Sequence, residues 1–152
     1  MPEETRSARV PHTVASGELP RRARRALTLG AASAAIAVAA GAFGAHALRD
    51  RVDLRLLEVF ETGARYQMYH AFGLITVAML LGRIGDAGST SARERLAVAA
   101  GRCFIVGTIL FSGSLYAMSM TGFRALGAIT PVGGLCFIAG WVCLAVAAGR
   151  AD

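Results

Sequence analysis

The stretch Thr62-Gly63-Ala64-Arg65-Tyr66-Gln67-Met68-Tyr69-His70-Ala71-Phe72-Gly73 passes without a break from polar and aromatic residues into an apolar run. The other apolar segments of the chain consist mainly of Ala, Gly, Leu, Val and Ile. Polar groups that enter a bilayer point inward and pair with one another, because lipid offers them no hydrogen bonds. This stretch is therefore the place where the sequence puts polar chemistry inside a chain that otherwise resembles a membrane protein.

Composition indicates which solvent the chain folds in. The 152 residues are 55% hydrophobic and only 17% charged, and the mean hydropathy is +0.51. Soluble domains contain about 45–50% apolar residues, so the surplus here favours a lipid bilayer. The length fits one domain, and a spanning segment in lipid must satisfy its own backbone, which predicts helices.

Four apolar segments are long enough to cross a bilayer, at about residues 26–47, 64–82, 96–120 and 125–148. Residues 1–25 are expected to form a flexible basic cytoplasmic tail, and residues 26–150 the transmembrane domain. Between the first two spans, residues 49–61 place apolar and charged side chains on opposite sides of a helical wheel. The predicted fold is an all-α integral membrane four-helix bundle with a short amphipathic interfacial helix between spans one and two.

Two local patterns predict where helices begin. Ser91 followed by Glu94 is a capping box and marks the start of the third helix. In the fourth span, Pro131 precedes Gly133 and Gly134. Either the helix kinks at Pro131, or Pro131 lies in its first turn and residues 125–130 pack as irregular backbone.

The first span carries small residues at alternating spacings of four and three, which predicts one face where a membrane-protein partner or a second copy could dock closely: Gly30, Ala34, Ala37, Gly41 and Gly44. A cleavable secretory signal is the alternative for this span, because a basic block at residues 21–25 precedes it. Its apolar run is longer than the ~7–15 residues of a signal core, which favours an uncleaved helix.

All sixteen basic residues are Arg, and the net charge is +6. In a membrane chain this balance is expected to set orientation by the positive-inside rule rather than to bind nucleic acid. Counting Arg by side predicts a multi-pass protein of the bacterial inner (plasma) membrane with both termini in the cytoplasm. The three cysteines form no CxxC pair and are expected to pack as small apolar residues.

The chemically distinctive residues of the four spans are expected to meet in the outer half of the bundle. The candidate ligand-binding residues are His46, Tyr66, Gln67, His70, Ser112, Ser114, Tyr116 and Thr130. One interpretation is interhelical hydrogen bonding together with an interfacial aromatic belt. The other is a small outer-leaflet pocket around His70 for a lipid, a quinone or another small molecule.

Two sharper hypotheses concern the histidines. A haem could be held between His46 and His70 if they lie at similar depth, but no other feature requires one, so we expect no cofactor and no metal. Ser112 or Ser114 with His70 is the one nucleophile–base pair the spans offer, and no acidic residue lies within any span. We therefore expect a non-enzymatic structural or accessory subunit of a membrane complex, with the lipid- or quinone-binding protein as the alternative.

Four motifs occur in order along the chain: Gly41-Ala42-Phe43-Gly44-Ala45-His46, Thr62-Gly63 through Tyr66-Gln67-Met68-Tyr69-His70, Phe111-Ser112-Gly113-Ser114-Leu115-Tyr116, and Thr130-Pro131-Val132-Gly133-Gly134 with Gly140-Trp141. Together they resemble the YgdD/YwdK-like family of small bacterial inner-membrane proteins, a domain-of-unknown-function family with a transmembrane relative in animals. The resemblance covers about residues 27–148. It implies four transmembrane helices and an uncleaved first span, and it implies no activity. The basic N-terminal tail looks longer than the family pattern needs.

Overall fold

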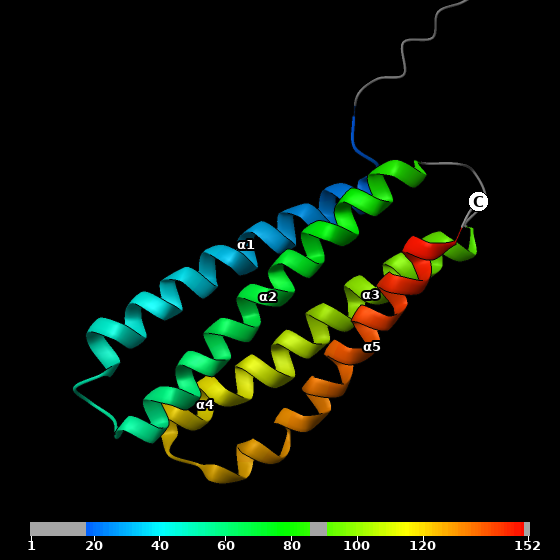
Figure 1. Cartoon of the computed structure of the whole chain (residues 1–152). Coiled ribbons are helices and arrows are strands. Elements are labelled where there is room, and N and C mark those ends of the chain that lie inside the picture. Colours follow the sequence, from blue (N-terminus) through cyan, green and yellow to red (C-terminus); the bar gives the residue numbers. More distant parts are fainter. Residues whose placement is uncertain (1–17, 86–90, 151–152) are drawn as a thin grey trace, which may run out of the picture.

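The computed structural model describes residues 18–85 and 91–150, and the ordered elements there are all helical. Most of the expected tail, residues 1–17, lies outside the described part. The long helices α1, α2, α3 and α5 run side by side along the molecule (Figure 1). In chain order the elements are α1 (Arg21–Phe43) with a π-helical end η1 (Gly44–Leu48), α2 (Leu54–Ile84), α3 (Ala92–Gly107) with a π turn η2 (Thr108–Ser112) and α4 (Gly113–Thr121), then a 3₁₀ helix η3 (Arg124–Ala128) and α5 (Thr130–Gly149). The all-α prediction is confirmed.

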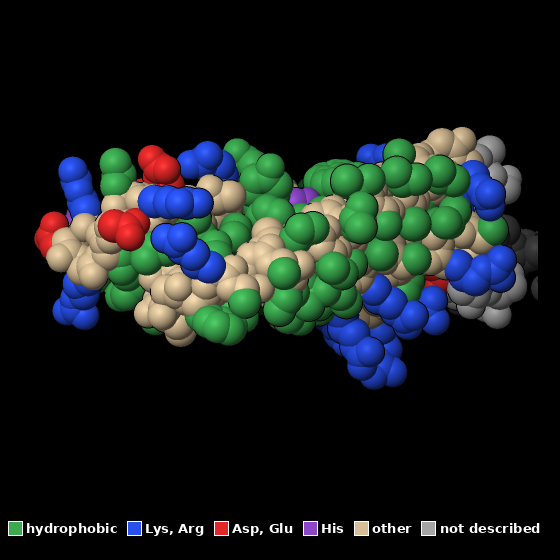
Figure 2. All heavy atoms as spheres, turned by 90° about the horizontal axis from the view of Figure 1, so that it is seen from below, with side chains coloured by type: hydrophobic (Ala, Val, Ile, Leu, Met, Phe, Trp, Pro, Cys, Tyr) green, Lys and Arg blue, Asp and Glu red, His purple; other side chains and the backbone are tan. Residues whose placement is uncertain are grey.

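Within residues 18–85 and 91–150, three helical runs are long and apolar enough to cross a membrane, namely Arg21–Leu48, Ala92–Thr121 and Arg124–Gly149. Figure 2 shows the matching surface, on which charged side chains gather toward both ends and hydrophobic side chains cover much of the middle. The 31-residue α2 is long enough but carries more polar residues, among them Arg65, Gln67 and His70. It is also the helix that packs against α1, α3 and α4, so its polar residues have protein neighbours.

The expected interfacial helix is not a separate element. Asp53 caps α2 by accepting a hydrogen bond from the Leu56 amide at 2.8 Å, and the helix then continues unbroken to Ile84. Leu57 and Phe60 are buried against Leu48. The amphipathic pattern of residues 49–61 therefore reflects packing inside the protein, not a helix lying on a membrane surface.

The positions at which α3 and α5 begin agree with the local sequence patterns. The Ser91 hydroxyl accepts a hydrogen bond from the Glu94 amide at 3.1 Å, which confirms the predicted start of α3. Pro131 lies in the first turn of α5, the second of the two alternatives, and the segment before it is a 3₁₀ helix instead of irregular backbone. At the other terminus α1 begins at Arg21, so the basic block at residues 21–25 is helical and does not belong to a tail.

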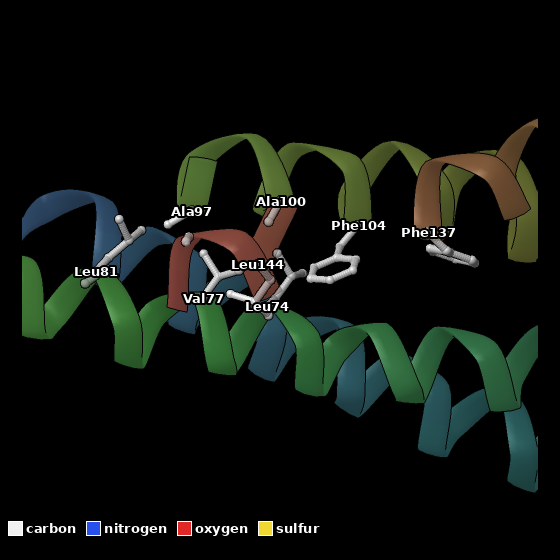
Figure 3. Packing of buried hydrophobic residues seen from close by; sticks show 10 residues of the cluster. Leu74, Val77, Leu81, Ala97, Ala100, Phe104, Phe137 and Leu144 are labelled. Carbon is white, nitrogen blue, oxygen red and sulfur yellow. The ribbon is translucent and has the colours of Figure 1, made fainter. Parts of the chain in front are cut away.

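The core lies mainly between α2, α3 and α5, where Leu74, Val77 and Phe104 are among the buried side chains (Figure 3). Its packing depends on glycines that face aromatic rings. Phe104 of α3 is fully buried between Gly73 of α2 and Gly140 of α5. A Cβ atom would lie 2.9 Å from the ring at Gly73 and 2.6 Å from it at Gly140. These glycines therefore give the ring its space, and close helix packing in a bilayer relies on such small residues.

The small-residue face of α1 packs largely against α2. A Cβ at Gly30 would lie 3.0 Å from the Ala71 carbonyl oxygen, and one at Gly44 would lie 3.3 Å from the Phe60 ring. Ala37 is also buried, Ala34 is half-buried, and Gly41 is exposed with open space around it. At most of its positions this face is thus occupied within the chain.

Candidate functional site

Gln67 joins three helices through its carboxamide. Its Nε2 donates to the Ser33 carbonyl of α1 at 3.1 Å, and its Oε1 accepts from the Tyr116 hydroxyl of α4 at 2.9 Å. Only 5% of Gln67 is exposed. The Tyr116 ring packs on Phe60 with centroids 4.8 Å apart and lies over Gly63, where a Cβ would be 3.0 Å from the ring. Both ends of the buried amide are therefore paired, as burial away from water requires.

His70 is enclosed by aromatic rings. Its imidazole stacks on Phe137 of α5 with ring centroids 3.3 Å apart and planes 5° apart. Phe104 and Trp141 lie 5.6 and 6.1 Å away by the same measure, and 4% of the residue is exposed. Its Nδ1 lies 2.7 Å from the Tyr66 carbonyl oxygen. Since a carbonyl only accepts, Nδ1 is the protonated nitrogen in this arrangement.

A pair of hydroxyls ties α4 to the start of α5. Ser114 Oγ donates to the Phe111 carbonyl at 2.9 Å and lies 2.8 Å from Thr130 Oγ1. Because Ser114 has one hydroxyl proton, Thr130 is the donor of the second bond. Ser112 is completely buried within the π turn, and no hydrogen bond is found for its Oγ. The hydrogen bonds of Ser114 and His70 thus go to other groups, and no serine–histidine pair forms.

Tyr66 forms the exposed edge of the same cluster. Its ring stacks on Phe111 with centroids 4.7 Å apart and lies 5.8 Å from the ring of Tyr69. Tyr66 is 39% exposed and Tyr69 51% exposed. The two tyrosines therefore face outward from α2, while Gln67 and His70 face inward.

His46 does not join the cluster. It is exposed within η1, at the end of the bundle where α2 begins. Gly30 lies beside Ala71 and Gly44 beside Phe60, so His70 is level with the middle of α1. By helical rise His46 is then roughly 20 Å farther along the bundle, and the expected similar depth of the two histidines is wrong.

The physical reason for that error is the length of α2. The helix begins at Leu54, which puts His70 about 24 Å from its start, whereas a helix that began at residue 64, as the sequence predicted, would put it about 9 Å from its start. His70 consequently lies near mid-height of α2, whereas Tyr116, which contacts Phe60 and Gly63, and Thr130, the first residue of α5, lie toward the end where α2 begins. The described residues hold no group of three or more His, Cys, Asp or Glu side chains that could bind a metal. The three cysteines are free and half-buried, which agrees with their predicted packing role.

Sequence reasoning missed the groups that surround the predicted residues. The Ser33 carbonyl and the rings of Phe104 and Phe137 were not anticipated. The sequence does contain a signal for these contacts, since glycines lie opposite the rings. A Cβ atom at Gly107, for example, would lie 2.5 Å from the Phe137 ring. Glycines on one helix and aromatic residues on a neighbouring one are a packing pattern that could have been searched for.

Comparison with known proteins places this arrangement among membrane proteins. A family model described as "Protein of unknown function (DUF423)" matches residues 40–134. The chain is 45% identical over 122 residues to the UPF0382 membrane protein YwdK of Bacillus subtilis, an alignment that covers 80% of this chain and 94% of that protein. UPF0382 membrane proteins of Staphylococcus epidermidis and Staphylococcus haemolyticus are 41% and 42% identical, over 80% and 79% of this chain and 92% and 91% of theirs. No solved structure matches the chain significantly.

Proposed function

Because the chain belongs to the DUF423 family, whose similar proteins are named membrane proteins of unknown function, we propose that it is a structural or accessory subunit of a membrane complex without catalytic activity of its own. The observation that carries the proposal is that four polar side chains of the central cluster are hydrogen-bonded within the protein. Two pairs of side chains bond to each other, Gln67 with Tyr116 and Ser114 with Thr130. Gln67 and Ser114 also donate to backbone carbonyl groups. Such a cluster orders helices and leaves few groups to bind a substrate.

The two alternative functions, catalysis by a serine–histidine pair and binding of a lipid or quinone around His70, have less support in the contacts of these residues. A nucleophile needs a base within about 2.6–3.2 Å, but Ser114 bonds to the Phe111 carbonyl and to Thr130, and no hydrogen bond is found for the Ser112 hydroxyl. A lipid or quinone pocket around His70 would need space beside the imidazole, where Phe137 already stacks at 3.3 Å. The enclosed histidine therefore favours a packing role over a binding role.

The surface that remains for a partner is the outward side of α1. This helix packs along α2 and makes no comparable contact with α3 or α5. Ala31, Ala35 and Ala42 are exposed and recur at helical spacing on one face. Small side chains permit close approach of another helix in lipid, so we place the partner helix against this face.

The same proposal treats α2 as a fourth membrane-crossing helix in the bacterial inner membrane. Both described ends of the chain lie at one end of the bundle (Figure 1). That end carries nine of the described arginines, against five at the other: Arg21, Arg22, Arg24, Arg25, Arg83, Arg93, Arg95, Arg102 and Arg150, against Arg49, Arg51, Arg55, Arg65 and Arg124. By the positive-inside rule the richer end faces the cytoplasm.

The test compares two matched substitutions by native mass spectrometry after gentle detergent extraction from the native membrane. Ala35→Leu enlarges the outward face of α1, and Ala139→Leu makes the same change on the exposed face of α5. We expect the unaltered chain and the Ala139 variant to be recovered in a larger complex, and the Ala35 variant to be lost from it. Recovery of the unaltered chain as a strict monomer would overturn the proposal.

A further inference from the structure

An open groove of about 950 Å³ runs between α1 and α3 at the arginine-rich end of the bundle. Leu74, Val77 and Leu81 of α2 line its floor, where they are almost fully buried, and the exposed Leu29 of α1 adds apolar surface at its side. Its walls come from the first turns of α1 and the first half of α3. The volume is in the range of sites that take small molecules, and the floor is a hydrocarbon surface.

Four arginines border this apolar groove: Arg22, Arg25, Arg95 and Arg102. Arg22 forms an ion pair with Glu94 at 2.6 Å, which links α1 to α3. The other three are exposed, and no ion pair to a described carboxylate is found for them. Figure 2 shows blue arginine side chains gathered at this end of the molecule directly beside the hydrophobic surface.

The positions of these arginines create a concentrated positive charge that an anion would neutralise. Arg95 and Arg102 are seven residues apart on α3, so they share a face and are separated by about 10 Å along it. Arg102 lies ten residues into the helix, about 15 Å from its start, which is deep for an unneutralised charge beside an apolar surface. The first turn of α1 adds to the positive field, because it has no acidic residue and no side-chain cap.

We propose that this groove binds an anionic glycerophospholipid from the leaflet at the arginine-rich end. Its phosphate lies among Arg25, Arg95 and Arg102, and the upper part of an acyl chain lies between Leu29 of α1 and Val98 of α3. The charge of the rim selects an anionic headgroup over a zwitterionic one, and basic pockets between membrane helices are suited to such lipids. The apolar floor selects a lipid over free phosphate.

The test is competitive lipid retention. The full-length protein in mild detergent is mixed with equal amounts of phosphatidylglycerol and phosphatidylcholine of the same chain length, and bound lipid is counted by native mass spectrometry. Phosphatidylglycerol is expected to be retained in preference. Replacing Arg25 and Arg102 together by Gln should weaken its binding roughly 30-fold, since each arginine near a lipid surface contributes about fivefold.

Two further variants separate the groove from general charge. Arg49→Gln with Arg51→Gln removes the same charge from exposed positions at the opposite end and should leave retention nearly unchanged. Ala99→Trp fills the groove without altering any charge and should abolish retention. Equal loss in the two double variants, equal retention of both lipids, or displacement of phosphatidylglycerol by excess inorganic phosphate would each overturn the proposal.

Discussion

Gly133 of α5 lies directly against the backbone of Phe111 in η2. A Cβ built at this position would lie 2.5 Å from the Phe111 backbone nitrogen, 2.9 Å from its Cα and 2.8 Å from its Cβ. Phe111 belongs to the π turn η2, so the obstacle is backbone and cannot rotate away. Gly134, the next residue, is the natural control, because a Cβ there would meet only the Phe111 ring at an ordinary 3.9 Å.

The expected difference between Gly133→Ala and Gly134→Ala follows from this geometry. Both substitutions gain the same helix propensity, up to about 1 kcal/mol, because alanine restricts the unfolded chain more than glycine does. Only Gly133→Ala forces α5 and η2 apart by about 1 Å, the gap between 2.5 Å and a normal carbon contact. Overpacking of this kind costs about 1–3 kcal/mol. The Gly133 variant should therefore be about 1–3 kcal/mol less stable than the Gly134 variant.

The measurement is the free energy of unfolding of each variant in mixed micelles, followed by circular dichroism as denaturing detergent is added. Because propensity cancels in the comparison, the difference reports the helix contact alone. Equal stability of the two variants, or a more stable Gly133 variant, would refute the tight contact between α5 and η2. It would also remove the physical basis for placing the Ser114–Thr130 hydrogen bond at the same junction.

Two other predictions concern single hydrogen bonds. A double-mutant cycle of Tyr116→Phe and Gln67→Leu should give a coupling free energy of about 0.5–1.5 kcal/mol, since interhelical hydrogen bonds in membrane proteins fall in that range. Additive effects of the two changes on the free energy of unfolding would show that this bond does not hold α4 to α2. Ser91→Ala should destabilise the start of α3 by about 1 kcal/mol, because the Glu94 amide loses its hydrogen bond to the Ser91 hydroxyl. The expected readout is faster amide hydrogen exchange confined to the first turn of α3, and unchanged exchange there would contradict the cap.

The continuous α2 changes how the polar residues of this chain are understood. An exposed polar helix would be costly in lipid, but Gln67 and His70 face inward and are covered by α1, α4 and α5. The outward side of the same helix presents Tyr66 and Tyr69. The long helix that is not among the sufficiently apolar runs is thus the one that has α1, α3 and α4 packed against it.

Local patterns predicted well wherever a few neighbouring residues decide the outcome. The Ser91–Glu94 box depends on backbone groups within one helical turn, and it appears as predicted. Pro131 takes the first-turn position, one of the two alternatives that the sequence left open. Gln67 and Tyr116 were candidates because polar side chains in apolar spans must find partners, and they are partners of each other. The depth of His70 was misjudged, because the helical wheel of residues 49–61 fits a surface helix and the start of a long helix equally well.

The amino-acid sequence alone determined that this chain is an all-helical membrane protein, because apolar length and the need to satisfy the backbone leave few other choices in lipid. It also determined the family, through four motifs in fixed order. Only the tertiary structure decided which groups meet. Gly133 against Phe111, His70 on Phe137 and the arginines of α1 beside those of α3 are contacts between segments distant in sequence. Such contacts depend on helix register and close packing, which no local pattern encodes.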